Sequence, residues 1–248
     1  MIGPPNARGR GQSHVVGVAL LLGVAVISMG ALTASIGAIV EENAAEADAA
    51  RVASDVDRAL RPVEVTGAHR GRLSFARGEL RTVERDLRLL DARGGVVETV
   101  AVGGLVFESG DRRVAFVAGA IVRGRPGRAR LQVEPPITAS RGDGGVLVVG
   151  APRLNASEGV SISGRGGVTV ALETHVRHRR VRVGNGTYRL AVETRTPEPW
   201  ADYLRERGAT VDRLDVDGDG VESVVAAFRG ERTTYLVVHD LNLEVGGG

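Results

Sequence analysis

The longest uncharged stretch of the chain places the strongest constraint on its fold. Between Gln12 and Val40 there is no Asp, Glu, Lys or Arg, and His14 is the only titratable side chain. As an α-helix this stretch would measure roughly 43 Å, more than the ~30 Å hydrocarbon core of a bilayer. The apolar region of a cleaved secretory signal is shorter, about 7–15 residues. The stretch therefore predicts a membrane-anchored helix over residues 12–40.

The charges that flank this stretch predict its orientation. Arg8 and Arg10 precede it with no acidic residue before them, whereas four acidic residues follow it before the next base, Arg51. Positive charge favours the cytoplasmic side of a membrane. We therefore expect residues 1–11 in the cytoplasm, a single span in membrane lipid, and everything after Val40 outside the cell.

Composition narrows the class of the external part. The whole chain has 32 basic residues, all Arg, which balance 30 acidic ones, so no nucleic-acid partner is expected. The chain has no Cys, which excludes disulfides and Cys-ligated metal sites. No nucleophile elbow, phosphate loop, dinucleotide fingerprint or His-Glu zinc helix occurs, so the sequence predicts no enzymatic activity.

Residues 41–61 predict a helical stalk. The segment is rich in Ala, a strong helix former. Val52, Val56 and Leu60 recur every four residues, which indicates one apolar face. Pro62 is expected to end the helix.

Residues 62–248 predict an external β-rich domain, because apolar and polar residues alternate between Gly-rich turns. Strands are expected at 72–76, 96–102, 105–108, 114–117, 131–134, 146–149, 168–176, 188–193, 221–228 and 233–238. A turn is expected at 184–186, and a short helix with Thr196 as N-cap, Trp200 as core anchor and Gly208 as stop. The fold class is α+β: a long N-terminal transmembrane and stalk helix, then a mainly antiparallel β-sandwich or barrel head with one short helix.

The start of the apolar stretch carries a motif, Arg10-Gly11-Gln12-Ser13-His14-Val15-Val16-Gly17. It resembles the class III signal peptides of archaeal, especially haloarchaeal, type IV pilin and archaellin precursors. In that family a short polar leader ends in a basic residue plus Gly, and a prepilin peptidase cuts before the apolar segment. The resemblance implies a cut between Gly11 and Gln12, removal of leader residues 1–11, and assembly with other pilin-like subunits into a surface filament. His14 replaces the Pro of many haloarchaeal pilins, which favours a minor subunit.

Small residues form a row within the apolar stretch. Gly30, Ala34 and Ala38 lie four apart, on one face of a helix. Small residues let membrane helices approach closely. The row is either a helix-packing face or the ordinary Gly and Ala content of a membrane anchor.

An acidic loop is the most suggestive external motif. Asp215, Asp217 and Asp219 are spaced like the first ligands of a calcium loop, and Gly220 follows them. The twelfth position of such a loop holds a Glu, whereas here it is Ala226. The flanking residues predict strands. No cofactor is certain; the loop is either a calcium site or an acidic hairpin turn.

Two further polar motifs have modest specificity. His175 and His178 precede an Arg run, but their odd spacing places them on opposite faces of a strand, so the segment predicts a solvated strand and turn. Asn155 and Asn185 begin N-glycosylation acceptor patterns, which matter only on an external domain.

Two hypotheses about function remain open. The first is a type IV pilin-like surface subunit, processed at Gly11 and assembled through its apolar helix. The second is a stand-alone, single-pass membrane-anchored β-domain that acts as a binding or wall-associated module. The N-terminus of the mature protein distinguishes them.

Overall fold

The computed structural model describes residues 11–61, 65–140, 142, 144–157 and 159–247. Its first element is a 50-residue helix, α1 (Gly11–Leu60). The chain divides into two compact units, Met1–Ala44 and Ala45–Gly248. Within α1, the segment from Val16 onward is long and apolar enough to cross a membrane, and its apolar window is fully exposed. The predicted long N-terminal helix is confirmed.

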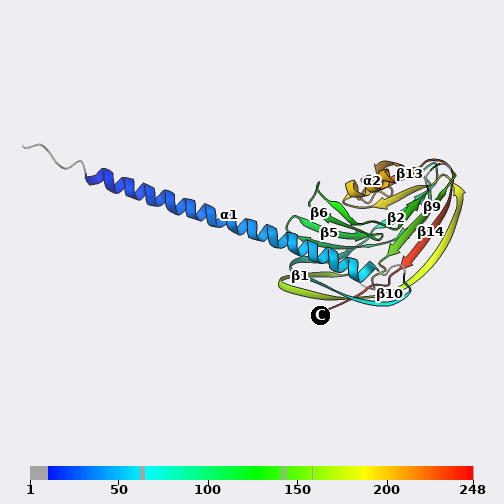
Figure 1. Cartoon of the computed structure of the whole chain (residues 1–248), viewed down its shortest axis with the longest axis horizontal. Coiled ribbons are helices and arrows are strands. Elements are labelled where there is room, and N and C mark those ends of the chain that lie inside the picture. The colour runs from blue at the N-terminus through cyan, green and yellow to red at the C-terminus, as the bar shows by residue number, and fades with distance from the viewer. Residues whose placement is uncertain (1–10, 62–64, 141, 143, 158, 248) are drawn as a thin grey trace, which may run out of the picture. The chain divides into compact units, whose positions relative to one another are not determined.

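The second unit, which we call the head, is built mainly of β-strands (Figure 1). The strands are β1 (Gly67–Val83), β2 (Asp86–Leu90), β3 (Val96–Ala101), β4 (Gly104–Ser109), β5 (Arg112–Val117), β6 (Ala120–Gly124), β7 (Arg130–Val133), β8 (Ile137–Ala139), β9 (Val146–Arg153), β10 (Ser161–Gly186), β11 (Arg189–Glu193), β12 (Ala209–Leu214), β13 (Ser223–Phe228), β14 (Arg232–Asp240) and β15 (Glu244–Gly247). One short helix, α2 (Pro197–Glu206), lies between β11 and β12. The expected α+β fold class is confirmed.

The strands form two sheets. The larger has the order β7-β6-β5-β4-β1-β10-β14-β9-β8, with β15 also paired to β10. The smaller has the order β12-β13-β11-β2-β3. All strand pairs described are antiparallel except β14 with β9. The long strand β10 curves along one side of the head and pairs with β1 over its first part and with β14 over its second (Figure 1).

Strands β5 and β6 separate two apolar cores. Phe116 and Ile121 face a core that contains α1 residues, whereas Val117 and Val122 face a core shared with the smaller sheet and α2. The alternation of side chains across a strand produces this division. Trp200 is fully buried in the second core, as predicted for a core anchor.

The last part of α1 belongs to the head. Its buried residues lie along one face of the helix: Ala49, Val52, Ala53, Val56, Ala59 and Leu60. The approach to β1 is close, because a Cβ at Gly71 would lie only 2.4 Å from the Cβ of Ala59. Of the segment expected as a stalk, residues 45–60 are therefore part of the folded head.

Two buried aspartates also attach α1 to β1. Asp48 Oδ2 accepts hydrogen bonds from the backbone N–H groups of Ala76 (3.0 Å) and Arg77 (3.1 Å). Asp55 Oδ2 accepts one from the N–H of Ser74 at 3.2 Å. These N–H groups of β1 thus receive carboxylate partners from α1.

The expected turn at 184–186 is wrong. These residues are the end of β10, where Asn185 lies opposite Thr233 of β14. The glycines serve a β-bulge instead: the register shifts between Arg182 and Gly184, and Gly184 has φ +117°. The turn expected after His178 is absent for the same reason, because β10 continues through the Arg run.

Candidate functional site

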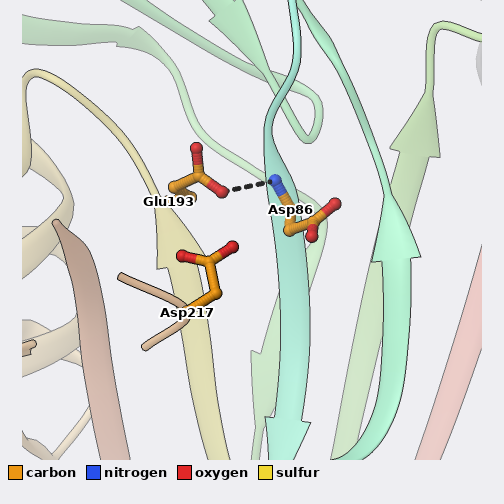
Figure 2. A group of neighbouring side chains, drawn as sticks. All are labelled: Asp86, Glu193 and Asp217. Atoms are coloured by element: carbon orange, nitrogen blue, oxygen red, sulfur yellow. Dashed lines mark hydrogen bonds between the residues drawn. The ribbon is translucent and has the colours of Figure 1, made fainter. Parts of the chain in front are cut away.

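The outer face of the smaller sheet carries a group of charged side chains. Side chains alternate along β2, so that Leu87 and Leu89 enter the core while Asp86 and Arg88 lie on the opposite face. Glu193, at the end of the neighbouring strand β11, lies beside Asp86 (Figure 2). Strand alternation thus places these charged side chains on the face opposite the core, a face that also carries the small apolar cluster of Leu90, Ala191 and Val225.

Arg88 lies at the centre of this group. Its guanidinium nitrogens are 2.6 Å from Asp86 Oδ2, 2.5 Å from Asp217 Oδ2 and 3.7 Å from Glu193 Oε2. Its side chain is only 6% exposed. A charge buried to this degree needs paired partners, because its desolvation costs several kcal/mol. One guanidinium therefore holds together three carboxylates from β2, from β11 and from the loop after β12.

Glu193 is the most buried acid of the group. Its Oε2 accepts a hydrogen bond from the backbone N–H of Asp86 at 3.1 Å (Figure 2), and its Oε1 lies 3.4 Å from Arg85 Nη1. Burial raises the pKa of Glu193, against the opposing effects of the Asp86 N–H and the two arginines. Burial likewise lowers the pKa of Arg85. Glu193 and Arg85 thus lie together in a poorly solvated part of the smaller sheet.

A groove of about 810 Å³ opens beside this group. Its lining comes from the β1–β2 connection, the β3–β4 turn, the segment after β9 and the acidic loop. The lining residues are Thr82, Val83, Glu84, Arg85, Asp86, Ala101, Gly103, Gly104, Leu154, Asn155, Ala156, Ser157, Gly159, Glu193, Asp217 and Asp219. The groove is thus a polar cleft with more carboxylates than guanidiniums in its wall.

The acidic loop connects β12 to β13 as a hairpin, and the prediction of flanking strands is confirmed. Asp215 accepts hydrogen bonds from the N–H groups of Gly218 (2.8 Å) and Gly220 (3.0 Å). Asp219 accepts one from the N–H of Val221 at 2.8 Å. These bonds give Asp215 and Asp219 the turn-forming role that Asp has in hairpins. The third aspartate, Asp217, points to Arg88 instead.

Two groups of carboxylates bring oxygen atoms within 4.8 Å of one another. One is the predicted set, Asp215, Asp217 and Asp219, all exposed; the other is Asp86, Glu193 and Asp217. Carboxylate oxygens are ligands that Ca²⁺ prefers. A cation in the second group would compete with Arg88 for Asp217. Calcium binding by the predicted set stays a prediction.

The two histidines of the Arg-rich segment lie on β10 and face different neighbours. His175 is in register with Ala68 of β1, whereas His178 is in register with His239 of β14. The Nδ1 atoms of His178 and His239 are 3.0 Å apart. The sequence pattern identified His178 together with His175, whereas the structure pairs His178 with His239 of another strand.

Both glycosylation candidates are exposed. Asn155 has φ +44°, and its Nδ2 donates to Asn242 Oδ1 at 2.8 Å. Asn185 accepts a 2.6 Å hydrogen bond from Thr233 Oγ1. Glycosylation of either residue stays a prediction.

The residues predicted for processing and helix packing lie at the other end of the chain. Gly30, Ala34 and Ala38 are exposed on α1, and nothing lies within 4 Å of a Cβ built on Gly30. Gly11 and Gln12 are the first residues of α1. Arg10 lies outside the described residues.

Sequence reasoning missed Asp86, Arg88 and Glu193. The run Asp86-Leu87-Arg88-Leu89 alternates charged and apolar residues, which is a strand pattern with a charged outer face. That signal could have identified β2. It could not have identified the partners, because Glu193 and Asp217 are more than 100 positions away in the sequence.

Comparison with known proteins gives one match. A family model described as a family of unknown function, DUF7289, matches residues 10–244 and so includes both α1 and the head. No curated protein and no solved structure matches the chain. The architecture fits a membrane-anchored surface protein, with an apolar N-terminal helix followed by a β domain. The chain belongs to the DUF7289 family.

Proposed function

We propose that the chain is a type IV pilin-like surface subunit, a minor one, without enzymatic activity. In this proposal a prepilin peptidase removes residues 1–11, and the new N-terminus at Gln12 begins the apolar helix. The subunit stays in membrane lipid until it assembles with other pilin-like subunits through that helix. The head then faces the outside of the cell.

The continuity of α1 carries the proposal. The helix runs without interruption from Gly11 to Leu60, and its last part is a structural element of the head. A simple anchor needs only a tether to the domain that it holds. In a subunit that assembles through its helix, the helix must also be packed into the head. Contacts between helices of neighbouring subunits then hold the head in the assembly as well. Asp48 and Asp55, which bond to the backbone of β1, meet this requirement.

The exposed part of α1 supports the assembly step. Large apolar side chains between Val16 and Val40 are more than half exposed. The row Gly30, Ala34 and Ala38 lies on one face and would let a second helix approach closely. The family match also begins at residue 10, two residues before the proposed new N-terminus at Gln12, and continues through the head.

The proposal is tested by the N-terminus of the mature protein. Intact mass and N-terminal sequencing of the membrane-extracted chain, made in an archaeal host with a prepilin peptidase, should give a start at Gln12. Replacing Gly11 with Leu should block processing, because a branched side chain before the cut would not fit a pocket that takes a small residue. Gly9→Leu is the matched control, since Arg8-Gly9 is the other basic-Gly pair.

Processing of Gly11→Leu at the normal position would overturn the assigned site. An intact leader on the wild-type chain would favour the second hypothesis, a stand-alone anchored β-domain. The observation that favours this second function is the polar groove beside Arg88, because a cleft of about 810 Å³ is large enough to receive a ligand.

A further inference from the structure

Two histidines from distant parts of the sequence form a cross-strand pair. His178 of β10 and His239 of β14 are directly opposite in the antiparallel register. Directly opposite side chains lie on the same face of a sheet. Their ring centroids are 5.0 Å apart, the rings are nearly perpendicular at 83°, and the two Nδ1 atoms are separated by 3.0 Å. The pair therefore brings two ring nitrogens within hydrogen-bond distance of each other.

This separation fits two ligands on one metal ion. Metal–imidazole distances are about 2.0–2.1 Å, so two nitrogens 3.0 Å apart subtend roughly 95° at a shared ion. That angle is close to the cis angle of a square or octahedral site. A regular tetrahedral site would need the nitrogens about 3.3 Å apart.

We propose that His178 and His239 bind one divalent transition-metal ion, with copper(II) preferred, through their Nδ1 atoms. Imidazole ligands in a tetragonal arrangement are typical of Cu²⁺ and Ni²⁺, and Cu²⁺ binds most tightly among the divalent first-row ions. The step needs no redox change. The imidazole that donates the Nδ1–H in the hydrogen-bonded pair moves that proton to its Nε2, and both neutral rings then offer an Nδ1 lone pair to the ion.

The surroundings of the pair favour such an ion over calcium. On the face of the sheet that carries the pair, the flanking residues of β10 are Val176, which is buried, and Arg180, which is exposed, because side chains alternate along a strand. Asp240, next to His239 on β14, pairs with Arg153. Calcium requires several oxygen ligands, and neither imidazole offers one. Nitrogen ligation by two imidazoles does not depend on nearby carboxylates.

The two imidazole rings differ in their exposure to solvent. His239 is 9% exposed and held in the sheet, whereas His178 is exposed, so water can complete the coordination. A bound ion would join β10 to β14. It would therefore stabilise the head by binding the folded state alone.

The test uses the untagged full-length chain in detergent micelles, in a His14→Gln background that removes the histidine of the apolar segment. Titration with Cu²⁺ alone should show one equivalent bound. Its electron paramagnetic resonance spectrum should show coupling to two imidazole nitrogens. Saturating Cu²⁺ at about tenfold excess over Kd should raise the thermal midpoint of the head by about 3–6 °C. Zn²⁺ should bind more weakly.

His178→Gln and His239→Gln should each lower the Cu²⁺ affinity by at least the roughly 10–100-fold that loss of an outer-shell partner costs. His175→Gln is the matched control on the same strand, and it should bind Cu²⁺ like the parent chain. Unchanged affinity in His178→Gln, or a spectrum with a single coupled nitrogen, would overturn the proposal. The spectrum of the parent chain decides the matter even if His239→Gln fails to fold.

Discussion

The two parts of α1 have the same secondary structure and opposite environments. Between Val16 and Val40 the large apolar side chains are exposed, and the segment contains no charged residue. Between residues 45 and 60 apolar and acidic residues alternate at helical spacing, and one face is buried in the head. The first part thus needs an apolar environment from outside the chain, whereas the second receives one from the chain's own strands.

Similar apolar side chains therefore have different roles in the two parts of α1. Leu60 is 2% exposed and Leu22 is 61% exposed. The burial of Leu60 contributes to the stability of the head, and that of Leu22 depends on lipid or on another subunit. Variants in each part of α1 separate these two contributions.

The first prediction concerns assembly. Changing Gly30 and Ala34 together to Ile should abolish recovery of partner pilins in pull-down while leaving membrane insertion intact. Ile keeps the span apolar, so the anchor survives. Branched bulk on the small-residue face prevents close approach of helix backbones. Equal membrane yield is checked by fractionation.

A matched double variant sharpens this test. Ala25→Ile with Ser28→Ile adds similar bulk on the opposite face of the helix. It should retain partner recovery. If both double variants recover partners equally, the row of small residues is ordinary anchor composition.

The second prediction concerns the stability of the head. Leu60→Ala should lower its free energy of unfolding by about 2–5 kcal/mol, because a buried apolar side chain is removed and a cavity is left. Leu22→Ala should change it by less than about 0.5 kcal/mol. Urea unfolding of both variants in micelles, followed by circular dichroism in the β region, gives the comparison. A large effect of Leu22→Ala would mean that the two parts are not independent.

The third prediction concerns the buried aspartates that attach α1 to β1. Asp48→Ala removes the acceptor of two backbone N–H groups, those of Ala76 and Arg77. The loss of these hydrogen bonds to a charged group should lower the free energy of unfolding by about 1–3 kcal/mol. Ser35→Ala, which removes a hydroxyl bonded only to the helix carbonyl of Ala31 among the contacts described, is the control and should be nearly neutral. The same unfolding measurement decides between them.

Local sequence patterns predicted a helix or strand well when all the residues that determine it lie within that element. The uncharged stretch predicted α1, and Thr196 and Gly208 bracketed α2 at its observed bounds. Thr196 is the N-cap residue by position, although its side chain makes no capping hydrogen bond. The residues that determine these two helices are close together in the sequence, so a local pattern is enough to predict them.

Elements that depend on distant partners were missed or misread. The segment at 184–186 has the composition of a turn, yet pairing with β14 keeps it extended. The charged group around Arg88 joins β2, β11 and the acidic loop, which only the fold brings together. His178 carried a recognisable signal, but only the register of β10 with β14 identifies His239 as its partner.

The last prediction, with the smallest effect, concerns the pH dependence of stability due to Glu193, a carboxylate on the outer face of the smaller sheet. Burial raises the pKa of Glu193 in the folded head. Between the unfolded pKa, about 4.3 for Glu, and the raised folded value, the folded state binds more protons than the unfolded state. The contribution of Glu193 to the free energy of unfolding therefore falls as pH rises through this window.

Glu193→Gln cannot titrate, so the difference in stability between the wild type and this variant should shift in favour of the wild type as pH is lowered through the window. The exposed Glu222→Gln is the control, because it lies immediately before β13 and outside the contacts of Arg88 described above. Urea unfolding at several pH values measures both differences. A wild-type advantage that instead grows with rising pH would mean that the ion pairs with Arg85 and Arg88 outweigh burial at Glu193. Arg88 would then stabilise the head through ionised carboxylates, as Asp48 does through backbone N–H groups on the buried part of α1.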